Sequence, residues 1–323
     1  MNTKLIALII ILSTFLFTTE KTLKDTPCPR NQPVIAYHKT DNIIYLFGGY
    51  CSTHKKRLND LWAYDGKNWN QIETPTSPEP RSGHTMVYNS ENQSLILFGG
   101  KNDNQELLND TWEWKNKKWT QLKIKGPPKR QSHSMTYHST DHGIYIFGGS
   151  NIEKASLNDT WVLKHNMWTQ LNFITDPPPR LQHKTAYDAS QNKIVLFGGF
   201  NRTENEKHVY GDTWELDKTG WTLKSNTKEL ARDHHALVYN HTIEKVILFG
   251  GYNNGYYGDT QIWNGRNWTL DSTNETLARA GKPGLIYHDA LKKIILFGGW
   301  NSTNKPLTDF WVYNIENKNW ETY

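Results

Sequence analysis

The sequence predicts an all-β fold of six repeated units, because three landmarks recur about every fifty residues. The first is an apolar run that closes in two glycines, the second of which is Gly49, Gly100, Gly149, Gly199, Gly251 and Gly299 in turn. The second is an aspartate that opens an aromatic or apolar segment: Asp60, Asp110, Asp159, Asp212, Asp259 and Asp309. The third is a tryptophan near the end of each unit: Trp69, Trp119, Trp168, Trp221, Trp268 and Trp320.

Each unit is predicted to form four short strands, called A to D in chain order. In the second unit, 84–88 and 94–100 are β-rich runs around a polar turn, 109–114 alternates, and 119–122 closes the unit. Short strands bounded by Gly, Asn, Asp and Pro are typical of all-β folds. One such sheet cannot bury both faces alone, so we expect the six sheets to stack around an axis as a β-propeller with strand A innermost.

The order of these motifs resembles the kelch repeat: an apolar run ending in Phe-Gly-Gly, then Asn-Asp-x-Trp, then a spaced tryptophan. The resemblance covers all six units and implies a six-bladed kelch β-propeller with four antiparallel strands per blade. This is the central-domain architecture of the galactose oxidases, without their copper site, since both cysteines lie in the first unit. Unit five departs from the pattern at Gln261, where the other units have tryptophan, so we expect looser packing there. The predicted blades are 30–72, 81–122, 130–171, 180–223, 232–270 and 279–323.

The repeated polar and aromatic residues are assigned to the scaffold. Each unit begins with an arginine, and strands A and C start at the same end of a blade, so we expect one bidentate Arg–Asp pair per blade. The first tryptophan of each unit is expected to be buried between blades. The scaffold residues assigned in this way include Arg81, Arg130, Arg180, Asp110, Asp159, Asp212, Trp112 and Trp161.

Four histidines also follow the period. They stand three residues after the arginine of their unit, where Pro33 and Lys282 stand in the first and last units, and they are His84, His133, His183 and His235. Imidazoles around a channel mouth could bind a metal. Residues that recur with the blade period are better explained by hydrogen bonds to a neighbouring loop. We therefore predict no metal ligands, no cofactor and no catalytic residues.

The connections between strands B and C do not repeat, and they are the predicted binding loops. They emerge at the same face as the arginines and differ in length and charge, as binding loops on a rigid scaffold do. Four of them begin with an aromatic residue that could stack against a sugar or a partner side chain, or could merely plug the channel mouth. The candidate ligand-binding residues are Tyr50, Phe200, Tyr252, Trp300, Lys55 and Arg57.

The N-terminus predicts export. Residues 5–17 are apolar and uncharged, which fits the core of a signal peptide, or an uncleaved membrane anchor, within residues 1–19. A linker follows at 20–29, and the propeller occupies 30–323. Cys28 and Cys51 lie opposite each other at the open end of the first hairpin, so either a disulfide suited to an oxidising compartment or two free thiols is expected. A secreted or cell-envelope location follows.

Composition narrows the function without naming it. The net charge of +5 is modest and both signs are interspersed, which argues against a nucleic-acid partner. The favoured function is an exported module that binds a protein or glycan through the loop face. The alternative is a small-molecule, carbohydrate-related enzyme with its site at the same channel mouth, and an envelope protein with no discrete ligand is also open.

Overall fold

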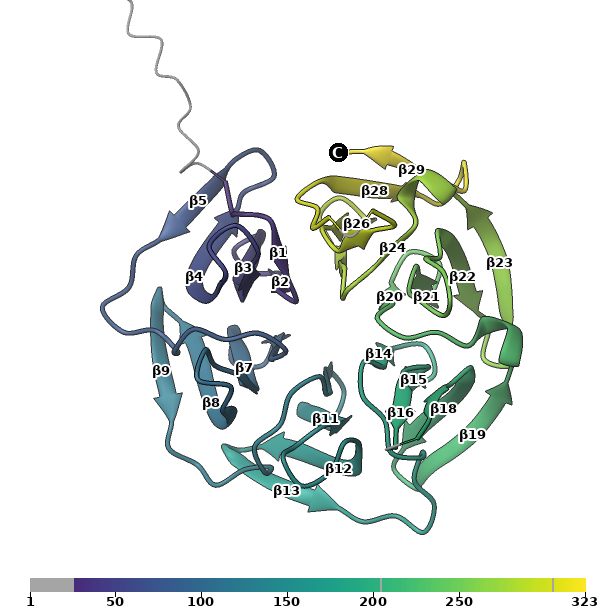
Figure 1. Cartoon of the computed structure of the whole chain (residues 1–323), viewed down its shortest axis with the longest axis horizontal. Coiled ribbons are helices and arrows are strands. Elements are labelled where there is room, and N and C mark those ends of the chain that lie inside the picture. Colours follow the sequence, from purple (N-terminus) through teal and green to yellow (C-terminus); the bar gives the residue numbers. More distant parts are fainter. Residues whose placement is uncertain (1–25, 204, 304) are drawn as a thin grey trace, which may run out of the picture.

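Six antiparallel sheets of four strands each surround a central channel (Figure 1). The computed structural model describes residues 26–203, 205–303 and 305–323. The first strand of every sheet is innermost and the fourth is outermost, so the predicted fold class, a six-bladed propeller with four antiparallel strands per blade, is confirmed. The expected signal peptide or anchor at 1–19 lies outside the described residues, as does most of the linker. Within the described ranges, no helix is long and apolar enough to cross a membrane.

Each blade is made from consecutive strands of one unit. Blades 1 to 3 contain β2 (Val34–His38), β3 (Ile43–Cys51), β4 (Lys56–Tyr64) and β5 (Trp69–Ile72); β6 (Thr85–Asn89), β7 (Ser94–Lys101), β8 (Leu107–Lys115) and β9 (Lys118–Leu122); β10 (Ser134–His138), β11 (Gly143–Gly149), β12 (Leu157–Lys164) and β13 (Met167–Leu171). Blades 4 to 6 contain β14 (Lys184–Asp188), β15 (Lys193–Phe197), β18 (Asp212–Asp217) and β19 (Gly220–Asn226); β20 (Ala236–Asn240), β21 (Lys245–Phe249), β22 (Asp259–Trp263) and β23 (Trp268–Thr273); β25 (Gly284–His288), β26 (Lys293–Phe297), β28 (Phe310–Asn314) and β29 (Asn319–Thr322).

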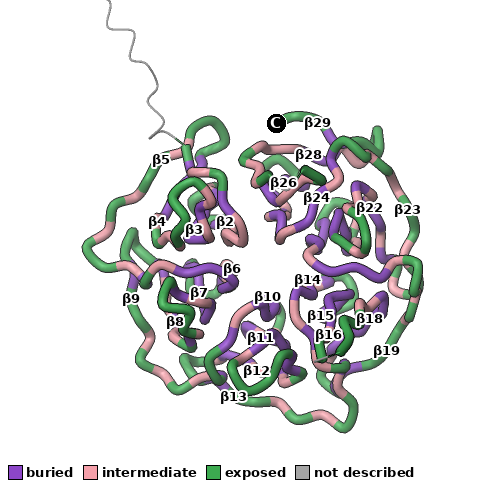
Figure 2. The backbone as a smooth tube through the Cα atoms, viewed as in Figure 1, coloured by how far each residue is buried: buried purple, intermediate pink, exposed green. Residues whose placement is uncertain are grey.

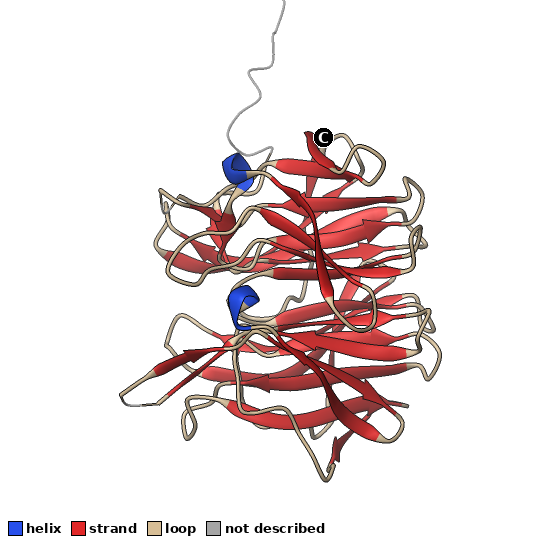
Figure 3. Ribbon diagram, turned by 90° about the vertical axis from the view of Figure 1, so that its right-hand side faces the viewer, coloured by secondary structure: helices blue, strands red, loops and turns tan. Residues whose placement is uncertain are grey.

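Short elements lie at the ends of the blades. The strand β1 (Arg30–Asn31) pairs with the end of β3, β16 (Phe200–Arg202) pairs with β17 (Lys207–Val209), and β24 (Arg279–Ala280) pairs with β27 (Trp300–Asn301). Two 3-10 turns, η1 (Lys228–Leu230) and η2 (Glu275–Leu277), follow β19 and β23 and are the helices seen from the side in Figure 3. Buried residues concentrate on the inner strands, whereas exposed residues lie along the outer connections (Figure 2).

The glycine pair that ends the second strand lets the next blade approach the backbone closely. In blade 1, Gly48 and Gly49 have φ of 61° and 97°, and the β3–β4 register shifts there. A Cβ on Gly48 would lie 2.9 Å from the carbonyl oxygen of Arg81, and the backbone N–H of Gly49 donates to that same oxygen at 2.9 Å. Glycine is therefore required both by the left-handed backbone conformation and by the contact between blades.

The tryptophan of each outermost strand packs on the phenylalanine of the Phe-Gly-Gly motif in the preceding blade. Ring centroids lie 4.7 to 5.5 Å apart in the six pairs, which are Trp119–Phe47, Trp168–Phe98, Trp221–Phe147, Trp268–Phe197, Trp320–Phe249 and Trp69–Phe297. A buried tryptophan removes about 150–250 Å² from water, worth on the order of 4–6 kcal/mol at about 25 cal/mol per Å². The last pair joins blade 1 to blade 6, so the contact that stacks the blades also closes the ring.

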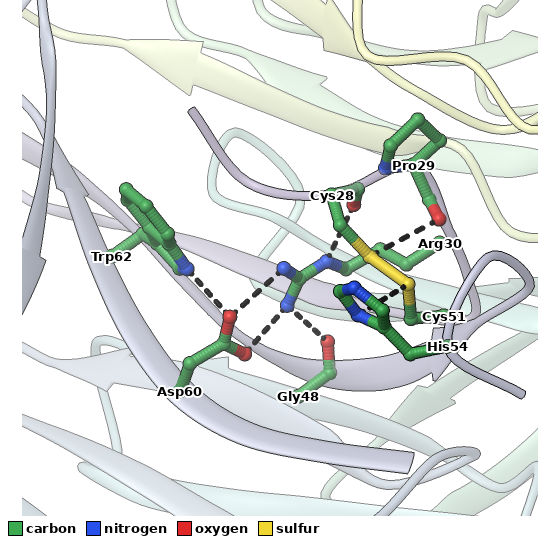
Figure 4. The surroundings of a disulfide bond; sticks show 8 residues. All are labelled: Cys28, Pro29, Arg30, Gly48, Cys51, His54, Asp60 and Trp62. Carbon is green, nitrogen blue, oxygen red and sulfur yellow. Dashed lines mark hydrogen bonds and ion pairs between the residues drawn. A yellow bond between two sulfur atoms is a disulfide. The ribbon is translucent and has the colours of Figure 1, made fainter. Parts of the chain in front are cut away.

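Every blade holds a bidentate Arg–Asp pair, and Figure 4 shows that of blade 1. The Arg30 guanidinium donates to both carboxylate oxygens of Asp60, at 2.6 and 2.9 Å, and to the carbonyl of Gly48 at 3.0 Å. Trp62 donates its Nε1–H to the same carboxylate at 2.6 Å. The pair is thus fully hydrogen-bonded inside the scaffold.

The same Arg–Asp pairing lowers the pKa of the aspartate in blades 2 and 3. Burial by itself acts to raise the pKa of Asp110 and Asp159. The hydrogen bonds from Arg81 and Arg130, together with their positive charges, outweigh burial and hold both pKa values below the usual range.

Gln261 fits into blade 5 without loosening it. Its Nε2 donates to Asp259 at 2.8 Å, as the tryptophan Nε1 does in other blades, and the residue is buried. Trp263 and the neighbouring β21 residues are fully buried. The sequence expectation of looser packing is therefore not met, because an amide replaces the indole as donor.

Within the described residues, blades 1 and 6 are joined by side chains, and no strand is shared between their sheets. Tyr64 stacks on Phe310 at 4.4 Å, and Lys39 pairs with Asp289 at 2.9 Å. Cys28 and Cys51 form a disulfide with a Cα–Cα distance of 6.4 Å, which ties the chain before β1 to the end of β3 (Figure 4). The N-terminal edge is thereby anchored at the point where the ring closes.

Candidate functional site

Six backbone positions form a frame around the channel mouth on the loop face. In every blade, the residue after the glycine pair is paired, by its backbone, with the residue that follows the blade's arginine. These pairs are Asn31–Tyr50, Ser82–Lys101, Gln131–Ser150, Leu181–Phe200, Asp233–Tyr252 and Ala280–Trp300. Four consecutive blades, 4, 5, 6 and 1, carry an aromatic residue at the loop position. We call Phe200, Tyr252, Trp300 and Tyr50 the aromatic arc.

A second frame lies directly inside the first. One residue of each blade, just before the innermost strand, has φ between 52° and 70°, and these residues are Gln32, Gly83, Ser132, Gln182, His234 and Lys282. Backbone N–H groups donate from blade to blade: Ser132 to Gly83 at 2.8 Å, Gln182 to Ser132 at 3.1 Å, His234 to Gln182 at 3.2 Å and Lys282 to His234 at 3.4 Å. This inner ring fixes the rim of the channel by main-chain bonds, so its side chains are free to differ.

The mouth pocket is a hollow of about 460 Å³ between the two frames. It is lined by Asn31, Gln32, Lys207, Asp233, His234, Tyr252, Tyr256, Ala280, Gly281 and Trp300. The sequence predicted Tyr252 and Trp300 as ligand-binding residues, and the structure places both in this one pocket. The other lining residues were not predicted.

Three ionisable side chains, from Asp233, Lys207 and His234, lie together at one side of the mouth pocket. Asp233 is fully buried, pairs with Lys207 at 2.6 Å, and accepts a hydrogen bond from His234. Burial acts to raise the pKa of Asp233, but the bonds and charges of His234 and Lys207 outweigh it and keep that pKa below the usual range. A fixed carboxylate, ammonium and imidazole therefore face the same hollow as the aromatic rings.

Trp300 is held against backbone at the pocket wall. A Cβ on Gly281 would lie 3.0 Å from Cδ1 of the indole, and Gly281 has φ of 75°, so only glycine leaves the ring this space. In the described part of the chain, the Trp300 Nε1–H is buried and has no hydrogen-bond partner. A buried donor without an acceptor is the kind of group that a ligand can satisfy.

The remaining predicted ligand-binding residues lie apart from the mouth pocket. Phe200 is buried beneath Lys207, whose Nζ lies 4.5 Å from the ring centroid. Tyr50 lies beside Arg57, and Arg57 donates to Ser82 at 3.0 Å and pairs with Asp103 at 3.4 Å. Lys55 is exposed at the tip of the β3–β4 turn. The structure thus brings Tyr252 and Trp300 together and leaves Tyr50, Lys55 and Arg57 to one side.

The four repeated histidines lie between blades. Each packs edge-on against the phenylalanine of the preceding blade, at 5.4 to 5.6 Å: His84–Phe47, His133–Phe98, His183–Phe147 and His235–Phe197. The hydrogen-bond partners of His133 and His183 are Thr85 at 2.6 Å and Ser134 at 2.9 Å. These are side chains at the inner strands of the preceding blades, rather than the loops that were expected.

The alignment of Lys282 with these histidines was wrong. Gly284 pairs with Phe297 as Thr85 pairs with Phe98, so Pro283 occupies the histidine position in blade 6. One extra residue between Arg279 and the inner strand moves Lys282 into the inner ring. The Lys282 side chain therefore does not take the histidine position between blades, and it lines the channel cavity.

The channel cavity, about 240 Å³ in volume, lies among the inner strands of all six blades. Lys184 and Lys282 both line it, together with His84, His133 and His183. Burial lowers the pKa of Lys184 to about 8, and burial together with the charge of Lys184 lowers the pKa of Lys282 to about 7. Sequence reasoning missed Lys184, although it stands where other blades have small or apolar residues.

One group of described residues has donor atoms close enough for a metal, and it consists of Cys28, Cys51 and His54. Its two thiols are consumed by the disulfide, so this group has no thiolate to offer as a ligand (Figure 4). The histidines of the channel do not form such a group in the described ranges.

Comparisons with known proteins agree with the repeat. Residues 66–225 match the KLHDC2/KLHL20/DRC7 Kelch-repeats domain, and residues 38–76 and 292–323 match the Kelch motif. The F-box/kelch-repeat protein At1g51550 of Arabidopsis thaliana is 41% identical over 51 residues, which is 14% of this chain and 10% of that protein. The solved structure of YjhT superposes with a TM-score of 0.72 over 93% of this chain and 99% of that one, at 16% identity, a likeness of fold alone.

Proposed function

Because this chain is a kelch-repeat β-propeller, we propose that it is a binding module that recognises a protein or glycan through the loop face at the channel mouth. Kelch domains commonly mediate protein interactions. The fold alone does not choose a ligand, so the proposal rests on the site. The observation that carries it is the placement of Tyr252 and Trp300 in one pocket, on backbone positions that the scaffold fixes.

The mouth pocket suits a ligand with apolar faces and polar edges. Aromatic rings carry a negative face that attracts the C–H faces of a sugar or the stem of a side chain. Asp233, Lys207 and the Asn31 and Gln32 amides stand beside those rings to bond hydroxyl or peptide groups. The volume of about 460 Å³ falls in the usual range for small-ligand sites of about 300–1,000 Å³. It therefore fits a terminal sugar unit or a short segment of a partner chain.

Export is part of this proposal. The apolar residues 5–17 and the Cys28–Cys51 disulfide both suit a secreted or envelope protein, because disulfides persist in oxidising compartments. Mass measurement of the protein recovered from medium or envelope fractions tests it. We expect either a chain shortened near residue 20 or a full-length chain held in the membrane fraction; a reduced, full-length cytosolic protein would contradict export.

The binding test uses a glycan array and a panel of purified secreted proteins, each with and without EDTA. We expect Trp300→Ala and Tyr252→Ala to weaken the strongest interaction at least about tenfold, since each removes an aromatic ring that lines the pocket. Lys101→Ala is the matched control, because Lys101 occupies the same frame position in blade 2, away from the pocket. A ligand that binds both aromatic variants as tightly as wild type would overturn the proposal.

A further inference from the structure

Two lysines line the channel cavity, and none of the described residues that line it carries a negative charge. Lys282 is only 8% exposed, and Lys184 enters the same cavity from the inner strand of blade 4. Lys282 lines this cavity together with His84, His133 and His183, which belong to blades 2, 3 and 4. Lys184 in turn acts on Lys282.

No acidic side chain balances these ammonium groups. Among the described residues that line the cavity there is neither aspartate nor glutamate, and no described residue forms a hydrogen bond or ion pair with Nζ of Lys184 or Lys282. The nearby arginines, such as Arg81, Arg130 and Arg180, are already paired with aspartates. A buried ammonium that lacks a partner is costly, and the cost falls when an anion supplies the missing charge.

Three histidines line the cavity beside the lysines. Both ring nitrogens of His84 are buried without a partner in the described structure, as is Nδ1 of His133 and of His183. Burial, followed by the charge of the neighbouring arginine, holds the pKa of each of these histidines well below 6.5, so the rings are neutral. A neutral imidazole always carries one N–H, which can donate to an oxyanion.

We propose that the central channel binds one compact oxyanion, a phosphate or carboxylate group, between Lys184 and Lys282. The cavity of about 240 Å³ lies below the usual range for drug-sized ligands, about 300–1,000 Å³, which favours a small ion or the anionic end of a small molecule. The site is distinct from the mouth pocket, and the inference does not rest on the proposed function. Trp300→Ala is therefore expected to keep anion binding.

The test is calorimetric titration of the full chain with inorganic phosphate, at constant ionic strength set by chloride and at pH about 6.5, which lies below the pKa values of both lysines. We expect one saturable site, weakened at least about tenfold by Lys282→Met and by Lys184→Met. Lys118→Met is the control, because Lys118 is exposed on β9. Methionine keeps the length and apolar stem of lysine, so these variants are expected to fold.

Titrations with glycerol phosphate and with acetate show whether the bound anion is a free ion or the anionic end of a larger molecule. If glycerol phosphate and acetate bind as well as inorganic phosphate, the cavity receives the anionic end of a larger molecule. If only inorganic phosphate binds, the ligand is the free ion. Absence of a saturable site for all three ligands, or equal affinity in wild type and Lys282→Met, overturns the proposal.

Discussion

The lysine pair makes a prediction about stability that needs no ligand. Burial and Lys184 lower the pKa of Lys282 from 10.5 to about 7, so the unfolded chain binds a proton more tightly than the folded chain does. Stability contributed through this group is therefore lowest at and below pH 7 and rises as the pH approaches 10.5. Each pKa unit corresponds to about 1.36 kcal/mol, so Lys282 lowers the free energy of unfolding by about 4 kcal/mol at pH 7.

Lys282→Met removes this penalty. About 2.1 cal/mol/K of unfolding entropy per residue over about 300 residues gives roughly 0.6 kcal/mol per degree, so the variant should melt about 6 °C above wild type at pH 7. At pH about 9.5 the gain should fall below about half, because Lys282 is then neutral in the folded protein. Thermal denaturation followed by circular dichroism, in buffer with chloride as the anion, measures both differences.

Lys118→Met is the control for the comparison of Lys282→Met with wild type. Lys118→Met replaces an exposed lysine and should leave the melting temperature unchanged at both pH values. A Lys282→Met protein that melts below wild type at pH 7, or whose gain is the same at both pH values, would refute the placement of an unpaired ammonium in the channel.

Three other predictions test separate parts of the structure. Thr160→Val leaves the Nε1–H of Trp221 without its acceptor at 3.0 Å, and should lower the free energy of unfolding in denaturant by about 1–3 kcal/mol; no change would show that this bond does not stabilise the blade contact. Replacing Cys28 and Cys51 by serine opens a loop with a sequence separation of 23, and should cost about 3 kcal/mol in the same assay; equal stability after reduction would contradict a constraint on ring closure. Phosphate affinity should fall as pH rises from about 6.5 to 9 while the channel lysines lose their protons, with proton uptake on binding near pH 7; a flat profile would mean that Lys282 takes no part.

The pH dependence of phosphate affinity is assigned to the lysines, because the other titratable groups that line the channel change charge outside the range from pH about 6.5 to 9. The histidines His84, His133, His183 and His235 have pKa values held well below 6.5, first by burial and next by a neighbouring arginine. Burial raises the pKa of Tyr37, at the far end of the cavity, above 10, and Tyr88 also lines this end. Between these limits, Lys184 and Lys282 are the groups in the described cavity with a pKa near 7 or 8.

The features that repeat in every blade could be predicted from the sequence. An arginine at the start of strand A and an aspartate at the start of strand C come together in every blade, because an antiparallel sheet places both at the same end. Tryptophans repeated at fixed spacing had to be buried between blades, since no single sheet can cover them. The disulfide was expected from a hairpin register that puts Cys28 opposite Cys51; the structure pairs Arg30 with Cys51, and Cys28, two residues earlier, still forms the bond.

The features that carry function were harder to predict, because they are exceptions to the repeat. Lys282 is displaced by one extra residue beside Gly281, and a one-residue shift cannot be seen until the strand register is known. Lys184 and Lys282 belong to blades 4 and 6, and only the arrangement of the blades around the axis brings both into one cavity. Lys207 reaches Asp233 of the next blade from the β16–β17 hairpin, a contact that no local pattern specifies.

Hydrogen–deuterium exchange on the full chain, with and without a ligand from the binding screen, shows whether ligands bind at the axis on the loop face. We expect slower exchange at 252–256, at 279–284 and at 300–303, with no change at the outer strands β9 and β13. Protection confined to the outer strands, or to the turns between the first and second strands of the blades, would contradict it.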